Sequence, residues 1–323
     1  MKKVPSKSCF VIGCTGQDGA LMCRSLLKKG FEVVGLTRKI NYSSINFKKL
    51  DIDEKFKVIP LDLNNHEKYM HLIEKYQPSE IYNLSAQSSV GLSFEKPLET
   101  YQSIIDATYN LLEICRKANY LGRIFFAGSS EIYGNVKGKA KINNPKFPIS
   151  PYALAKISSM NFVKFYREIY KLNCLTGVLF NHESCLRPEN FVTQKIITGA
   201  IKSLKDQKYK FKVGNIDIIR DWGDAEEYVE VIQIITRAKI LKDQIICTGR
   251  GTSLREFMNK VFNQLSLRWE EHVEIEPSLF RKSDIKRSVG DPEDCFNDTG
   301  WKFSVDTDSL IKKLIKEKIN KKF

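Results

Sequence analysis

A glycine-rich turn near the N-terminus constrains the fold more than any other feature of the sequence. The apolar segment Ser8–Ile12 is typical of a buried strand, and a helical pattern over Ala20–Lys29 follows the turn. Glycines between a strand and a helix allow a tight turn and let backbone N–H groups approach a pyrophosphate. A plain turn would tolerate the same glycines, but the strand–turn–helix context favours dinucleotide binding. The residues concerned are Gly13, Thr15, Gly16, Gln17, Asp18 and Gly19.

Strand-like and helix-like segments alternate over the first 180 residues. This alternation predicts an α/β protein with a Rossmann-type, doubly wound parallel sheet. The expected strands are Ser8–Ile12, Phe31–Thr37, Lys57–Leu61, Glu80–Leu84, Arg123–Ala127 and Asn173–Phe180. The expected helices are Ala20–Lys29, Glu67–Lys75, Thr108–Ala118 and a long one from Pro151 to about Tyr170, capped by Ser150. We expect a cofactor-binding domain at 1–180, with segments returning from about 215–250, and a smaller, mainly substrate-binding domain at 181–323.

Composition excludes several classes of protein. The 323 residues are 42% hydrophobic, and no apolar run approaches the roughly 18 residues that a membrane helix needs. The net charge of +14 is spread along the chain, so we expect neither a nucleic-acid nor a membrane partner. The basic run 312–322 is interpreted as an amphipathic helix with a solvated face, a membrane or nucleic-acid role being the alternative. None of the eight cysteines has zinc-ligand spacing, so we expect no metal and a reducing, cytoplasmic location.

The end of the second expected strand bears on the cofactor. In dinucleotide-binding folds an acidic residue there binds the ribose of NAD, whereas a cation suits the 2′-phosphate of NADP. This chain has Arg38 and Lys39, so we expect NADP. A solvent-exposed pair of cations is the alternative reading in so basic a chain.

Two further groups of residues carry chemistry. Ser129 and Glu131 follow the expected strand Arg123–Ala127, and Tyr152 and Lys156 open the long helix. A tyrosine and a lysine four residues apart share one helix face. A nearby ammonium favours the phenolate, which makes a tyrosine a usable base near neutral pH. All four lie where strands end at their carboxyl edge, which is where open α/β sheets bind ligands.

With these motifs the chain resembles the extended short-chain dehydrogenase/reductases and, within them, the GDP-mannose 4,6-dehydratase family. The resemblance extends from about residue 10 to 300. It rests on the segments Thr15–Gly19, Glu80–Ser88, Ser129–Gly134, Ser150–Ala153, Leu179–Ser184, Phe191–Ile196 and Arg220–Ala225. The strings Phe180–Ser184, Phe191–Lys195 and Arg220–Gly223 are the most specific of them.

The resemblance implies a GDP-sugar 4,6-dehydratase that forms a 4-keto-6-deoxy sugar. Tyr152, poised by Lys156, would take the proton of the sugar 4-hydroxyl while hydride moves from C4 to NADP⁺. Ser129 would hydrogen-bond that oxygen. Glu131 would remove the C5 proton and help to expel the 6-hydroxyl as water, after which hydride returns to C6. A surface acid is the alternative interpretation of Glu131.

The resemblance also implies binding residues and a homo-oligomer, a dimer or tetramer. Those expected at the cofactor are Asp62, Leu63, Leu84, Ala86, Gln87, Ser88, Tyr152, Lys156, His182 and Arg187. A core histidine is the alternative interpretation of His182. Those expected at the GDP-sugar are Ser129, Asn181, Val192, Lys195, Arg220 and Arg281. Arginine and lysine side chains suit a diphosphate, and arginine can bind it through two hydrogen bonds.

Some positions depart from the family pattern. Ser129 replaces a threonine. Glu99 stands where the family usually has a tyrosine near the nicotinamide ribose, and Tyr101 is a possible substitute. Cys185 and Leu186 depart from the residues that usually follow the Asn-His-Glu-Ser string. These changes favour a hexose other than plain mannose, with GDP-N-acetylglucosamine first and GDP-mannose second. A sugar-nucleotide epimerase or reductase, and a non-catalytic NADP-sensing protein, are the alternatives. Glu131 argues against an epimerase or reductase, which needs no base for elimination at C5. The presence of Tyr152 and Lys156 argues against a non-catalytic protein.

Overall fold

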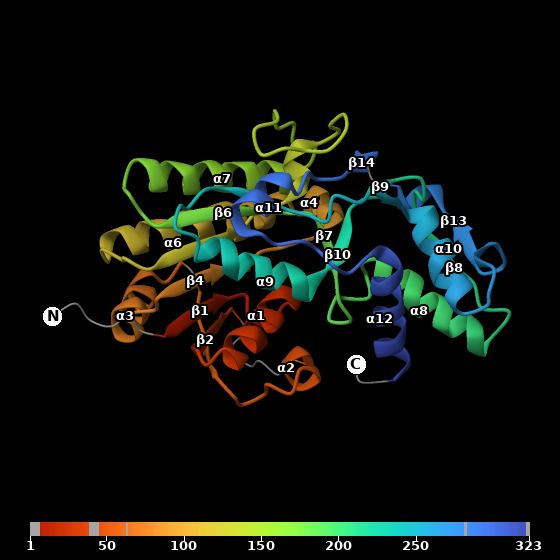
Figure 1. The fold of residues 1–323 in the computed structure, drawn as a ribbon, viewed down its shortest axis with the longest axis horizontal. Helices are drawn as coiled ribbons and strands as arrows, with labels where there is room; N and C mark the ends of the chain where they lie inside the picture. The colour runs from red at the N-terminus through yellow and green to blue at the C-terminus, as the bar shows by residue number, and fades with distance from the viewer. Residues whose placement is uncertain (1–6, 39–44, 63, 281–282, 321–323) are drawn as a thin grey trace. The chain divides into compact units, whose positions relative to one another are not determined.

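The computed structural model describes residues 7–38, 45–62, 64–280 and 283–320 (Figure 1). The chain divides into two compact units. The first comprises Met1–Ile132, Lys146–Leu179 and Val229–Gln244. The second comprises Tyr133–Pro145, Phe180–Tyr228 and Ile245–Phe323. The chain therefore returns twice to the first unit, the second time within residues 215–250.

A seven-stranded sheet in the order β11-β6-β5-β4-β1-β2-β3 organises the first unit. Neighbouring strands from β6 to β3 pair in parallel. All five residues of β1 are buried, as a strand covered on both faces requires. The strands are β1 Ser8–Ile12, β2 Glu32–Thr37, β3 Lys57–Pro60, β4 Glu80–Asn83, β5 Arg123–Ala127, β6 Cys174–Leu179 and β11 Gln244–Ile246.

Helices cover both faces of this sheet. Helices α3, α6 and α7 pack side by side (Figure 1) and bury an apolar cluster against the strands. Ser25 of α1 and Lys29, which follows its last residue, donate hydrogen bonds to Glu230 in the middle of α9. The helices are α1 Gln17–Lys28, α2 Ile45–Lys49, α3 His66–Tyr76, α4 Val90–Glu95, α5 Pro97–Tyr101, a π-helical turn Gln102–Asp106, α6 Ala107–Lys117, a 3-10 turn Ser130–Tyr133, α7 Pro151–Glu168 and α9 Ala225–Thr236.

The described residues of the second unit form short strands and the helices α8, α10, α11 and α12, together with the first turn of α9. Three small sheets pair β7 with β10, β9 with β12 and β14, and β8 with β13. Helices α8, α10 and α12 pack together over one apolar cluster. Its elements are β7 Asn181–Glu183, α8 Val192–Lys205, β8 Phe211–Val213, β9 Ile219–Arg220, β10 Trp222–Asp224, β12 Thr252–Ser253, α10 Leu254–Gln264, a 3-10 turn Trp269–Glu271, β13 Val273–Ile275, a 3-10 turn Pro277–Leu279, β14 Arg287–Ser288, α11 Glu293–Thr299 and α12 Thr307–Ile319.

Local sequence signals explain several of these elements. Ser150 caps α7 by accepting a hydrogen bond from the Ala153 N–H, and Pro151 occupies the first helical position. Helix α12 buries Leu310, Ile311, Leu314 and Ile315, so the basic run is the polar side of an amphipathic helix. No helix of the described residues is long and apolar enough to cross a membrane. The expected doubly wound α/β fold is confirmed.

Candidate active site

The strand order brings two loops together at one edge of the sheet. Strand β1 pairs with β2 on one side and with β4 on the other, so the chain leaves the ends of β1 and β4 in opposite directions. Such a reversal opens the crevice in which open α/β sheets bind ligands. The segments at this point are residues 13–19, after β1, and residues 84–89, after β4. Both contain predicted cofactor-binding residues.

Gly13 lies where the glycine turn meets the end of β4. Its φ is +81°, and a Cβ atom would lie 2.8 Å from both Cα and N of Ser85. A side chain on Gly19 would collide with the carbonyl oxygen of Gly13. These are the tight turn and the close helix–strand packing for which a dinucleotide-binding turn uses glycine.

The remaining turn residues lead into α1, which begins at Gln17. No side chain of the described residues caps the helix at Gly16, and the N–H groups of a helix N-terminus attract phosphate. The carbonyl of Thr15 accepts a hydrogen bond from Asn46 Nδ2 at 3.0 Å. The Gln17 amide donates to the Asp18 carboxylate at 2.9 Å. The turn therefore offers a ligand mainly backbone donors.

The segment after β4 contains a strained residue. The φ of Ala86 is +151°, and strained backbone of this kind concentrates at ligand sites. The Gln87 amide donates to the Thr100 hydroxyl at 3.2 Å, which ties the segment after β4 to α5. Leu84 is half-buried, and Ser88 is exposed.

Tyr152 and Lys156 lie on consecutive turns of α7, and both are buried. The Lys156 Nζ atom lies 5.7 Å from the centre of the Tyr152 ring and donates to the carbonyl oxygen of Ala127 at 2.8 Å. Burial lowers the pKa of Lys156 to about 8, and the charge of Asp18 opposes this shift. The glycine turn and the Tyr-Lys pair thus interact electrostatically through Asp18.

Ser129 and Glu131 follow β5, whose last residue is Ala127. Ser129 is buried, and its Oγ atom accepts a hydrogen bond from the Glu131 N–H at 3.3 Å. Glu131 is half-buried. Because Lys156 is hydrogen-bonded to Ala127, all four predicted catalytic residues are tied to the carboxyl end of β5 or to α7 beside it. The first unit therefore contains the whole catalytic set.

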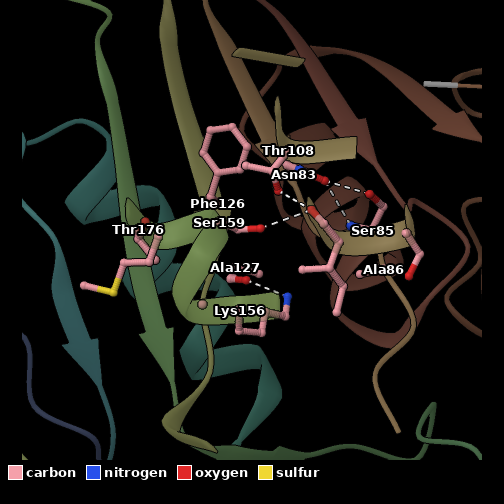
Figure 2. A pocket seen from close by; sticks show the side chains of 13 residues that line it. Asn83, Ser85, Ala86, Thr108, Phe126, Ala127, Lys156, Ser159 and Thr176 are labelled. Atoms are coloured by element: carbon pink, nitrogen blue, oxygen red, sulfur yellow. Dashed lines mark hydrogen bonds between the residues drawn. The ribbon is translucent and has the colours of Figure 1, made fainter. Parts of the chain in front are cut away.

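A small cavity lies against Lys156. Figure 2 shows Asn83, Ser159 and Thr176 among the side chains that line it, together with Lys156. Its volume, for the centre of a water molecule, is about 20 Å³, which admits about one water. The cavity is too small for a substrate.

Predicted substrate residues of the second unit meet around β7 and β9. Asn181 pairs with Trp222, two residues beyond Arg220. The buried Arg220 donates to the carbonyl oxygen of Ile285 at 2.7 Å. His182 donates from Nδ1 to the carbonyl oxygen of Phe180 at 2.7 Å, and its ring stacks on Tyr228 with centroids 4.4 Å apart.

Other predicted residues surround the start of α8. Val192 is its first residue, and Lys195, half-buried, belongs to its first turn. The Arg187 guanidinium lies over the Phe191 ring at 3.9 Å, and its Nε atom is 3.7 Å from Glu183 Oε2. Arg187 is thus held by residues that flank the start of α8, the helix that carries Val192 and Lys195.

Besides Gly16 and Ser88, which are exposed, four further predicted positions lie at the surface or outside the described residues. Arg38 and Asp62 are exposed, whereas Leu63 and Arg281 fall outside the described residues. Lys39, which supports the NADP expectation, also falls outside them.

The departures at Glu99 and Tyr101 differ in their surroundings. Glu99 is exposed and pairs with Lys96 at 2.9 Å. Tyr101 packs against the buried cluster that includes Tyr152. Of these two positions, Tyr101 is therefore the one that brings an aromatic ring toward the Tyr-Lys pair, and Phe94 packs against the same cluster.

Three residues near these groups carry no role predicted from the sequence. Asn46 holds the glycine turn, and Ser159 hydrogen-bonds the π-helical turn. Asp221 is fully buried and accepts hydrogen bonds from Thr248 and Gly249. Burial raises the pKa of Asp221 to about 6. It lies within the segment Arg220–Ala225 on which the family resemblance rests, and that membership was the signal that could have marked it.

Comparison with known proteins decides the family. The family model described as GDP-mannose 4,6 dehydratase matches residues 10–314. The chain belongs to the GDP-mannose 4,6-dehydratase family. GDP-mannose 4,6 dehydratase 1 of Arabidopsis thaliana is 34% identical over 97% of this chain and 90% of the plant protein. GDP-mannose 4,6 dehydratase of Homo sapiens is 32% identical over 96% of this chain and 91% of its own length.

A solved structure supports the fold of this family member. The dTDP-glucose 4,6-dehydratase of Bacillus anthracis, crystallised with NAD, has a TM-score of 0.85. The alignment covers 98% of each chain at 17% identity, so it supports the fold alone. Within the described residues, no group of three or more His, Cys, Asp or Glu side chains could hold a metal ion.

Proposed function

We propose that this protein is a GDP-sugar 4,6-dehydratase that works with a tightly held NADP. The family match over residues 10–314 carries the proposal, and relatives such as those of Arabidopsis thaliana and Homo sapiens are named GDP-mannose 4,6 dehydratase. The first unit supports it chemically, since Ser129, Glu131, Tyr152 and Lys156 lie around the end of β5 and the start of α7. The enzyme is then a hydro-lyase.

The glycine turn fits a nicotinamide dinucleotide. A side chain at Gly13 or Gly19 would meet backbone atoms, so the turn keeps its N–H groups accessible to a diphosphate. When bound, the nicotinamide supplies a hydride acceptor for C4 and a hydride donor for C6 of the sugar. Residues 13–19 and 84–88 would hold it.

The catalytic residues divide the proton transfers between them. Tyr152 takes the proton of the 4-hydroxyl, and Lys156 stabilises the resulting phenolate. Ser129 donates a hydrogen bond to the same sugar oxygen. The 4-ketone acidifies the C5–H bond, and Glu131 removes that proton and assists departure of the 6-hydroxyl as water.

The second base distinguishes this reaction from the alternative functions. An epimerase or reductase on the same fold needs the Tyr-Lys pair but has no elimination at C5 to catalyse. Glu131, whose N–H bonds to Ser129 Oγ, is placed beside the serine that would bind the substrate oxygen. This placement favours dehydration.

The second unit would supply the GDP-sugar contacts. Asn181, Val192, Lys195, Arg220 and Arg281 are the proposed ligands, with His182 and Arg187 at the cofactor. Arg220 is already held by backbone carbonyl groups, so less freedom is lost when its guanidinium binds a diphosphate.

We extend the proposal to the cofactor, the hexose, the oligomeric state and the location of the enzyme. Arg38 and Lys39 favour NADP over NAD. The departures from the family pattern at Cys185 and Leu186 favour GDP-N-acetylglucosamine as substrate, whereas the names of the relatives favour GDP-mannose. Exposed Tyr109 of α6 and Phe165 of α7 support a homo-oligomer. Eight buried, free cysteines support the cytoplasm.

A substrate panel tests the function. Purified protein is incubated with GDP- and UDP-hexoses, and loss of water is followed by mass. We expect water loss from a GDP-hexose without net consumption of added NADP. Net reduction of the cofactor, or inversion at C4 without water loss, would refute dehydration. The ratio of kcat/KM for GDP-mannose and GDP-N-acetylglucosamine then identifies the hexose.

A further inference from the structure

The helix that leads toward the catalytic pair is interrupted. Helices α5 and α6 are continuous in sequence except for the π-helical turn Gln102–Asp106 between them. A single π-turn inside an α-helix redirects backbone groups and is frequent at functional sites. Ile104, at the middle of this turn, is buried.

Ile104 contacts α7 in two ways. Its side chain belongs to a buried cluster with Val90, Tyr152 and Ala155. Its carbonyl oxygen accepts a hydrogen bond from Ser159 Oγ at 3.1 Å and another from Thr108 Oγ1 at 2.7 Å. The π-turn therefore packs against the catalytic tyrosine and is hydrogen-bonded to the helix that carries it.

Ser159 and Lys156 attach α7 at two neighbouring points. They are three residues apart and so lie on one helix face. Lys156 bonds to the end of β5 through Ala127, and Ser159 bonds to the π-turn. Figure 2 shows both side chains at the cavity, with the Lys156–Ala127 bond as a dashed line. The start of α7 is thereby fixed between the sheet and the α5–α6 helix.

A cavity of about one water's volume adjoins these hydrogen bonds. Lys156, Ser159 and Thr176 line it, so packing is incomplete at this one point of α7. Thr176 Oγ1 is buried and has no hydrogen-bond partner among the described residues. Atoms that line a void lose packing contacts on that side, so the directed hydrogen bond of Ser159 contributes to holding α7 at this point.

We propose that Ser159, acting with Ile104 of the π-turn, is a positioning residue that holds Tyr152 and Lys156 in their reactive arrangement. This inference rests on the proposed function, because it assigns Tyr152 and Lys156 to proton transfer. Ser159 touches neither substrate nor cofactor in this account. Its loss affects the rate of the chemical step and leaves binding unchanged.

The test compares two serine substitutions on one helix. Ser159→Ala removes the buried hydrogen bond, whereas Ser158→Ala removes an exposed bond of the same type, from Ser158 Oγ to the carbonyl oxygen of Leu154. We measure kcat and KM with the GDP-hexose, the Kd of NADP by fluorescence titration, and the Tm. We expect kcat of Ser159→Ala to fall about three- to tenfold, the usual weight of one neutral hydrogen bond. KM and the NADP Kd stay at wild-type values, and Ser158→Ala matches the wild type in all measurements.

Two further variants sharpen the result. Ser159→Thr keeps the hydroxyl, and the cavity can take its methyl group, so kcat should recover. Ile104→Val keeps the hydrogen bond but loosens packing on Tyr152, and it should lower kcat without changing KM. This variant keeps the proposal testable if Ser159→Ala does not fold.

The outcomes separate this inference from the proposed function. Equal kcat values for Ser159→Ala and Ser158→Ala, or a weaker NADP affinity with unchanged kcat, would overturn the positioning role. For a misfolding Ser159→Ala, an unchanged kcat in Ile104→Val overturns it. Tyr152→Phe serves as the reference for the function itself: wild-type turnover in that variant would refute the role of Tyr152, whatever Ser159 does.

Discussion

Gly13 offers a direct test of the cofactor turn. Substitution by alanine introduces two costs: a side chain at a φ of +81°, and a Cβ atom 2.8 Å from two backbone atoms of Ser85. Carbon atoms in contact prefer about 3.5 Å or more, so the turn and the end of β4 must separate by about 0.7 Å. Backbone atoms of two paired strands cannot rotate away as a side chain could. We therefore expect both lower stability and a displaced phosphate-binding turn.

The magnitude follows from a matched control. Gly30 has a φ of +75° but nothing within 4 Å of an added Cβ atom. Gly30→Ala therefore reports the conformational cost alone, about 1–2 kcal/mol. Gly13→Ala adds an overpacking cost of about 1–3 kcal/mol. The difference between the two variants isolates the close approach of the turn to β4.

Urea denaturation gives the free energy of unfolding of each variant, and fluorescence titration gives the Kd of NADP. We expect Gly30→Ala to bind NADP like the wild type. Gly13→Ala should be the less stable variant and should bind NADP about tenfold more weakly or worse, which corresponds to about 1.4 kcal/mol. Equal stability and equal NADP affinity of the two variants would show that the turn does not depend on the approach to Ser85.

Three further substitutions test other parts of the reasoning. Glu131→Gln keeps the shape of the side chain but removes the base, so dehydration should fall about 10²–10⁴-fold; full turnover measured by water loss would exclude Glu131 from this role. Arg38→Asp should repel the 2′-phosphate and shift binding from NADP toward NAD; unchanged relative Kd values for the two cofactors would contradict this. Lys156→Met removes an ammonium whose pKa burial lowers from 10.5 to about 8. Between these pH values the folded protein binds fewer protons at Lys156 than the unfolded chain does. As the pH is raised from 8 to 10.5, the free energy of unfolding of the wild type should therefore increase relative to that of Lys156→Met, by up to about 3 kcal/mol. Urea denaturation at pH 7, 8, 9 and 10 measures the difference, and a constant difference would refute the shift.

Local patterns in the sequence determined the elements that carry the site. The strands Ser8–Ile12 and Arg123–Ala127 have the predicted bounds. A short apolar run that lies between glycine or polar residues leaves few positions at which the strand can begin or end. The start of α7 is also local, since Ser150 and Pro151 supply the cap and the first turn. The spacing of Tyr152 and Lys156 then fixes both on one helix face. Short stretches of sequence were therefore enough to predict the fold class and to recognise the motifs.

The tertiary structure decided which of these elements meet. Strand β4 follows β1 by about seventy residues, yet pairs with it, and only that pairing brings Gly13 against Ser85. The hydrogen bonds of Asn46 to Thr15 and of Asp221 to Thr248 likewise join distant segments. Such contacts depend on long-range packing, which leaves no periodic trace in the sequence.

The contacts of Ser159 illustrate the same limit at close range. The sequence shows that Ser159 lies three residues after Lys156. Its hydrogen-bond acceptor is the carbonyl oxygen of Ile104, which reaches Ser159 only because the π-turn packs against α7. A backbone carbonyl has no sequence identity, so no motif can mark the bond. The sequence by itself therefore determined the chemistry of the catalytic residues, and the tertiary structure determined what holds them in place, because that support comes from backbone groups and burial.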